Sequence, residues 1–122
     1  MANPNIVNVS EITGNTVRVK LTTAAGTVGI LTNTSSSNKV FKINTIRCAN
    51  STNSGISYVN VGINQVGSGV TQYLVFGVEI PAGTALAVLD KNSPIYLTEN
   101  TRVAVSCTSQ NADIIISYED IS

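Results

Sequence analysis

The stretch that decides the fold is residues 73–100, YLVFGVEIPAGTALAVLDKNSPIYLTEN. Its first eight residues alternate between two faces, which is the two-residue period of a β-strand. The other parity, which includes Tyr73 and Glu79, is expected to face away from the core. The alternation predicts that four apolar side chains share the core face: Leu74, Phe76, Val78 and Ile80.

Turn signals divide the remainder of this stretch. Pro81-Ala82-Gly83 predicts a turn, because proline fixes φ and glycine accepts a positive φ at little cost. Residues 85–89 then form a second predicted strand, 90–94 a second turn, and 95–97 a short third strand. Strands joined by such short turns predict a β-meander.

The flanking sequence repeats this pattern of short strands and polar turns. No segment longer than a turn shows helical spacing, and breaks recur about every 8–12 residues, which is typical of sandwiches and barrels. A change of parity near Asn44 and Thr45 predicts a β-bulge. The further predicted strands are residues 16–22, 27–31, 39–49, 56–63, 102–107 and 113–122.

The predicted architecture is an all-β, antiparallel β-sandwich of jelly-roll type with an N-terminal arm. A length of 122 residues fits one domain. We expect residues 15–122 to form that domain and residues 1–14 to be an arm or an edge strand. Four aliphatic side chains of this segment are predicted subunit contacts: Ile6, Val7, Val9 and Ile12.

Charge is scarce in this chain. Charged residues make up 11% of it, the net charge is +0, and Asn, Ser and Thr supply about a third of all residues. The seven basic residues are scattered, whereas binding to a phosphate backbone requires clustered cations. We therefore expect no nucleic-acid partner.

Membrane and export signals are not found in the sequence. No run approaches the roughly 20 apolar residues that span a bilayer. The opening MANPNIVNVSEITG has neither a basic region nor a sustained apolar region. We expect a protein made in the cytoplasm with no membrane partner.

The residues most often used in catalysis are few. The chain contains no histidine, which removes the commonest general base and metal ligand. Cys48 and Cys107 lie in apolar strand patterns, and two small buried thiols are favoured over a disulfide because cytosolic proteins rarely keep disulfides. We expect a non-enzymatic protein with no catalytic residues, no metal and no cofactor.

Two classes of ligand, calcium and sugars, compete with ordinary structural uses of the acidic and aromatic residues. Calcium would need loop carboxylates, but no DxDxD-type loop is present, so solvated turn acids are the favoured interpretation of Asp90, Glu99, Asp113 and Asp120. Sugar sites use exposed aromatic platforms. The chain has no Trp, and packing in the core or at an edge is the favoured use of Tyr58, Tyr73, Tyr96 and Tyr118.

Four segments carry a family resemblance: MANPNIVNVSEITG, NKVFKINTIRCAN, IPAGTALAVLDKNSPIYLTENTRVAVS and IIISYEDIS. Together they resemble small virion structural proteins of tailed bacteriophages, especially phages of marine cyanobacteria and other marine bacteria. The resemblance covers almost the whole chain. The chain has Glu99-Asn100-Thr101 where Glu-Gly-Asp is more usual, and asparagine can adopt the same turn.

The resemblance implies a non-enzymatic building block present in many copies on the virion. The first hypothesis is a capsid decoration or cement protein that stabilises the head lattice, assembled as a homotrimer and bound to the major capsid protein. The alternative is a tail or baseplate-associated protein with a host-receptor-binding role. A host-facing lectin is a third hypothesis.

Overall fold

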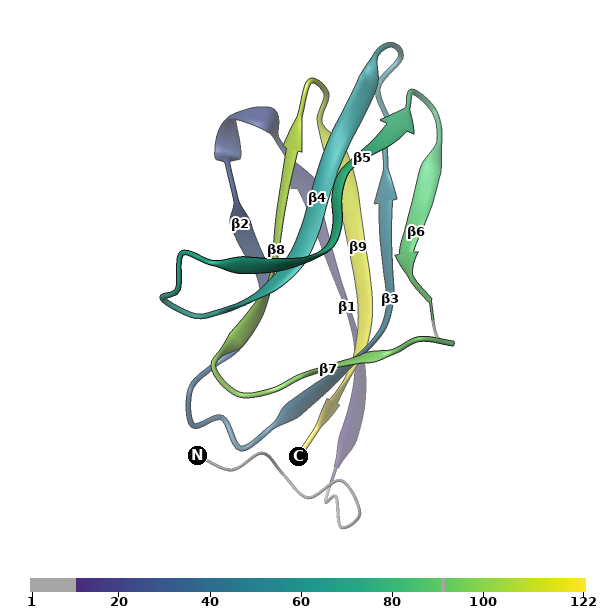
Figure 1. Ribbon diagram of the computed structural model, residues 1–122. Coiled ribbons are helices and arrows are strands. Elements are labelled where there is room, and N and C mark those ends of the chain that lie inside the picture. The colour runs from purple at the N-terminus through teal and green to yellow at the C-terminus, as the bar shows by residue number, and fades with distance from the viewer. Residues whose placement is uncertain (1–10, 91) are drawn as a thin grey trace.

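The computed structural model describes residues 11–90 and 92–122 as two facing antiparallel sheets (Figure 1). Its only helical segment within those residues is one 3₁₀ turn, η1 (Thr23–Ala25). The strands are β1 (Ile12–Leu21), β2 (Val28–Asn33), β3 (Val40–Ala49), β4 (Ile56–Gln65), β5 (Thr71–Pro81), β6 (Ala85–Leu89), β7 (Ile95–Leu97), β8 (Thr101–Thr108) and β9 (Ala112–Ile121).

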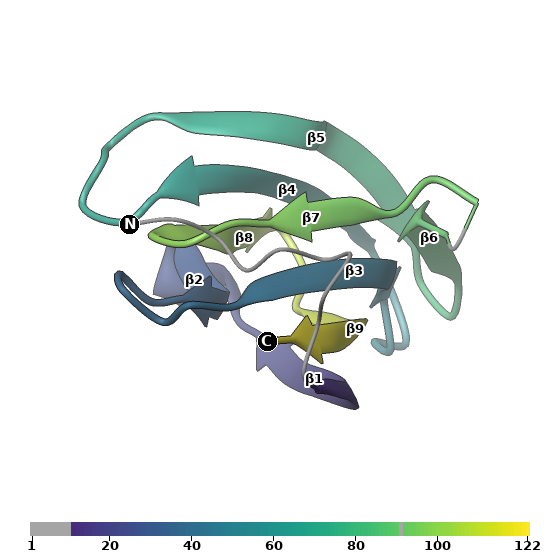
Figure 2. The ribbon, with the colours of Figure 1, turned by 90° about the horizontal axis from the view of Figure 1, so that it is seen from below.

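Each sheet combines strands from different parts of the chain. Sheet A has the order β1-β9-β3-β6, with β7 also paired to β3. Sheet B has the order β2-β8-β4-β5. Figure 2 shows β1 and β5 at opposite margins of the molecule, as expected for edge strands of different sheets. The predicted all-β, antiparallel, two-sheet architecture is confirmed.

The core lies between the two sheets and is aliphatic. Ile46 and Ile116 from sheet A are fully buried, as are Val61 and Val103 from sheet B. Complete burial of such side chains stabilises a fold by about 1.5–3 kcal/mol each. The alternation that predicted β4, β8 and β9 is confirmed, because Val59, Val105 and Ile114 are also buried.

Two local predictions are confirmed by backbone geometry. In β3, Ile43 pairs with Tyr118 and Thr45 pairs with Ser117, so Asn44 is the extra residue of the predicted bulge. Asn100 has φ 64°, the left-handed conformation that a turn here requires and that asparagine tolerates. β1 begins at Ile12, four residues before the predicted strand start.

The predicted β-meander is wrong. β5 pairs with β4 in sheet B, whereas β6 and β7 pair with β3 in sheet A. Asn50 supplies the physical reason, because it ties the corner after β5 to the end of β3. Its backbone N–H donates to the Thr84 carbonyl at 2.9 Å and its carbonyl accepts from the Gly83 N–H at 2.8 Å. Its side-chain amide donates to the Ile80 carbonyl at 2.9 Å.

The predicted core face of β5 is also wrong in part. Val78 packs against the core and Ile80 is buried, as expected. However, the side chains of Leu74 and Phe76 are exposed, Phe76 by 71%, and Val75 packs inward instead.

Bulges in β5 explain this reversal. Between Val78 and Val75, β5 has two residues, Phe76 and Gly77, where β4 has only Asn60. Gly77 has φ 67° and its N–H donates to Asn60 Oδ1 at 2.6 Å. Because one extra residue reverses the alternation of a strand, Phe76 points away from the core.

Candidate functional site

The carboxylates considered as calcium ligands have other partners and lie apart. Asp113 accepts from Lys20 at 2.8 Å and Asp120 from Lys39 at 3.1 Å. Asp90 Oδ1 accepts from the Asn92 N–H at 2.9 Å. The Asn38 N–H donates to Glu99 Oε2. Within residues 11–90 and 92–122, no three His, Cys, Asp or Glu side chains come together to hold a metal ion.

Both cysteines are free and buried, as predicted. They lie on different sheets, Cys48 in β3 and Cys107 in β8. Burial raises the pKa of the Cys48 thiol to about 12 and also raises the pKa of Cys107. Cys107 Sγ donates to the Leu21 carbonyl at 3.7 Å. Both groups are therefore neutral thiols with the packing role of small apolar side chains.

The four tyrosines divide into one packed and three exposed side chains. Tyr118 packs against the core and contacts Phe41, with ring centroids 5.1 Å apart. Tyr58, Tyr73 and Tyr96 are exposed, although packing was predicted for each of them. Three aromatic rings are therefore available to contact another molecule.

The predicted subunit contacts fall largely beyond the described part of the chain. Ile6, Val7 and Val9 lie outside the described residues. Ile12 lies at the start of β1, opposite Ile121 of β9, and its side chain is 56% exposed.

An exposed apolar surface on β5 and the turn before it is the first candidate site. We define the β5 surface as Val70, Tyr73, Leu74 and Phe76, all of which are exposed. Tyr73 and Phe76 contact each other edge to face, with ring centroids 4.8 Å apart. β5 is an edge strand of sheet B, and residues 66–78 contain no charged side chain. Sequence periodicity missed this surface, and Gly77 is the residue that signals the break in alternation.

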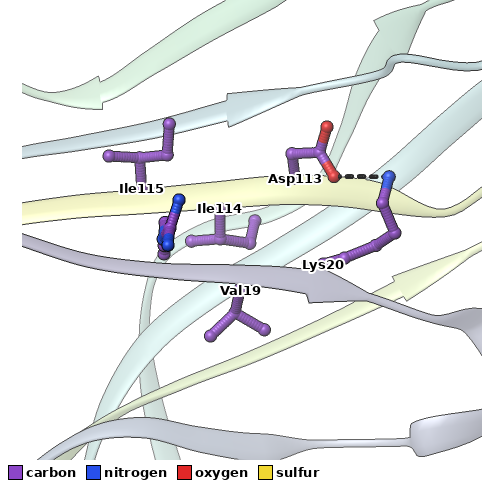
Figure 3. A pocket seen from close by; sticks show the side chains of 6 residues that line it. Val19, Lys20, Asp113, Ile114 and Ile115 are labelled. Carbon is purple, nitrogen blue, oxygen red and sulfur yellow. Dashed lines mark ion pairs between the residues drawn. The ribbon is translucent and has the colours of Figure 1, made fainter.

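The outward face of sheet A is the second candidate site. An open depression of about 270 Å³ lies along β1 and β9, lined by Arg18, Val19, Lys20, Asp113, Ile114 and Ile115. Figure 3 shows Lys20 and Asp113 pointing toward one another at one end of the depression. The Lys20 ammonium donates a hydrogen bond to Asp113 and thereby lowers the pKa of that carboxyl. The sequence pattern predicted a strand at residues 16–22 but no site there.

A comparison with known protein families and a search of curated proteins both find no match to this chain. Within the described part of the chain, no helix is long and apolar enough to cross a lipid bilayer.

Proposed function

We propose that the chain is a non-enzymatic structural protein of a tailed-phage virion, a capsid decoration or cement protein that stabilises the head lattice. The β5 surface carries this proposal. Exposed clusters of large apolar side chains mark contacts with other proteins, and on this surface exposed Tyr73 and Phe76 contact each other. Tyrosine and phenylalanine are enriched at protein interfaces. The β5 surface supports a protein–protein contact, and the sequence resemblance to virion structural proteins is the reason for placing that contact on a phage particle.

A second copy of the chain is the proposed occupant of the β5 surface. Residues 66–78 carry no charge, so the β5 surfaces of three copies meet around a three-fold axis without repulsion or buried unpaired ions. The net charge of +0 also allows many copies to lie close together on a particle. The Tyr73–Phe76 contact holds both rings in place before a partner arrives, which lowers the entropy cost of association.

The finer fold proposal is a jelly roll with an N-terminal arm. The strand pairs β1–β9 and β2–β8 support it. A jelly roll is a long hairpin wrapped into two sheets, so the first strand pairs with the last and the second with the last but one. Residues 12–14 of the predicted arm belong to β1, where they pair with β9, so the proposed arm is the segment before β1. In this proposal Ile6, Val7 and Val9 contact a neighbouring subunit of a homotrimer, together with Ile12 at the start of β1. The exposure of Ile12 supports a contact at this point.

Immunogold labelling of purified particles of the phage that encodes this chain tests the proposal. A decoration protein gives regularly spaced gold over the head, and mass spectrometry of the same particles finds many copies per particle. Gold confined to the tail or baseplate overturns decoration and supports the receptor-binding alternative. Absence of the chain from purified particles overturns both virion roles.

A further inference from the structure

A cross-strand row on the outward face of sheet A places two arginines on either side of one isoleucine. Arg18 of β1 pairs with Ile115 of β9, and Ile115 pairs in turn with Arg47 of β3. All three side chains are exposed, Ile115 by 44%. Because neighbouring strands lie about 4.8 Å apart, the two arginine backbones are separated by about 10 Å.

The other charges of this face are balanced locally. Lys20 pairs with Asp113 at 2.8 Å. Lys42 of β3 lies directly opposite Glu119 of β9 in the register, and Glu119 Oε2 accepts a hydrogen bond from the Asn44 side-chain amide at 2.9 Å. These two pairs lie on either side of the row, because β9 presents Asp113, Ile115, Ser117 and Glu119 along its length.

Arg18 and Arg47 have no such partner. No described residue forms a hydrogen bond or ion pair with either guanidinium, and both lie opposite an apolar side chain. The four cations and two acids of this face therefore leave a net charge of +2, which these two arginines carry. Two unpaired arginines on strands that flank an exposed isoleucine form a site for negative charge next to an apolar group.

We propose that this row binds an acidic segment of another protein, whose carboxylates pair with Arg18 and Arg47 and whose apolar side chain covers Ile115. Guanidinium groups bind carboxylates in a planar, two-pronged geometry. The open depression beside Ile115 leaves room for the apolar group (Figure 3). A nucleic-acid strand fits less well, because its successive phosphates approach Asp113 and Glu119 beyond the row.

Binding of an acidic segment by this row does not depend on the proposed function. Only the location of that acidic partner on a virion rests on it. The positive row, formed by Arg18, Ile115 and Arg47, lies on sheet A, whereas the uncharged β5 surface lies on sheet B. The two surfaces therefore accept different partners. A copy of the chain on one face and an acidic neighbour on the other are compatible in one assembly.

An NMR titration of the full chain with a capped hexapeptide of alternating glutamate and leucine tests the site. We expect saturable shifts at the amides of Arg18, Arg47 and Ile115. Replacing both arginines (Arg18→Gln with Arg47→Gln) is expected to weaken binding at least about fivefold, as the loss of two exposed ion pairs predicts. Lys42→Gln is the matched control, since it removes the same charge from a position that lies opposite an acidic residue, and it is expected to change binding less than twofold.

Several outcomes overturn the inference. Equal binding by the wild type and the double variant excludes the two arginines. Equal binding of the matching lysine–leucine peptide shows that the site does not select for negative charge. A short oligothymidine that shifts the same amides and binds more tightly identifies a nucleic-acid surface. The titration needs no particle, so its result is independent of whether gold labels the phage head.

Discussion

Ile116 and Phe76 are both large apolar side chains, but they occupy opposite environments. Ile116 is fully buried between the sheets, whereas Phe76 is 71% exposed. Ile116→Ala is expected to lower the free energy of unfolding by about 2–5 kcal/mol, through lost burial and the cavity that remains. Phe76→Ala is expected to change it by less than about 0.5 kcal/mol, as substitutions on an exposed surface do. Urea denaturation measures both, and a loss above about 2 kcal/mol for Phe76→Ala would place that ring in the core.

The Cys48 thiol makes stability sensitive to alkaline pH. The unfolded thiol ionises near its ordinary pKa of 9.0, whereas burial raises the folded pKa to about 12. Above pH 9 the unfolded chain therefore binds fewer protons, and stability falls as pH rises from about 9 towards 12. Cys48→Ala is expected to show a shallower loss than the wild type over this window in parallel urea titrations. Identical slopes for the two proteins would show that Cys48 does not ionise on unfolding.

At the level of single elements, the pairing of β5 with β4 requires a glycine at position 62 of β4. A Cβ added at Gly62 would lie 2.5 Å from the Gln72 carbonyl oxygen, which is backbone and cannot rotate away. Gly62→Ala is therefore expected to destabilise the protein by about 1–3 kcal/mol, as overpacking does. Gly69→Ala is the matched control, because nothing lies within 4 Å of its added Cβ and its φ is not positive. Thermal unfolding that ranks Gly69→Ala as the more damaging change would contradict the register of β4 and β5.

The corner between β5 and β6 depends on Asn50. The Asn50 side chain is buried, and its amide donates to the Ile80 and Gly55 carbonyls at 2.9 Å and 3.2 Å. Asn50→Ala leaves these acceptors without their donor, so a loss of about 1–3 kcal/mol is expected. Asn53→Ala in the same loop is the control, because Asn53 is exposed, and it should unfold like the wild type in urea. Equal stability of the two variants would show that other contacts hold the corner.

Strand positions were predictable from sequence at this scale, but the pairing of β5, β6 and β7 was not. Alternation is a local signal. Among the described residues it located both ends of eight of the nine strands to within about two residues, and the exception is the start of β1. The bulge at Gly77 depends on how β5 pairs with β4, so the two-residue period of the sequence did not reveal the one extra residue. The corner after Ile80 was interpreted as a hairpin because its partner, Asn50, lies 30 residues away in the sequence.

At the level of the whole molecule, the sandwich class followed from strand spacing, but the surfaces did not. The β5 surface exists because Phe76 and Leu74 point outward, which reverses the sequence prediction. The positive row exists because β9 lies between β1 and β3, so that Arg18 and Arg47 flank Ile115. Both features depend on long-range pairing, which residue patterns alone do not specify.

Multi-angle light scattering of the full chain tests the proposed self-association most directly. The wild type is expected to have a mass that is a multiple of the 12.8 kDa chain mass, and three copies is the proposed number. Phe76→Ser combined with Tyr73→Ser is expected to give a folded species of 12.8 kDa. Ile115→Ser, which removes an exposed apolar side chain from the opposite sheet, is expected to keep the wild-type mass. A wild type that stays at 12.8 kDa at millimolar concentration, or a double variant that keeps the wild-type mass, would contradict association through the β5 surface.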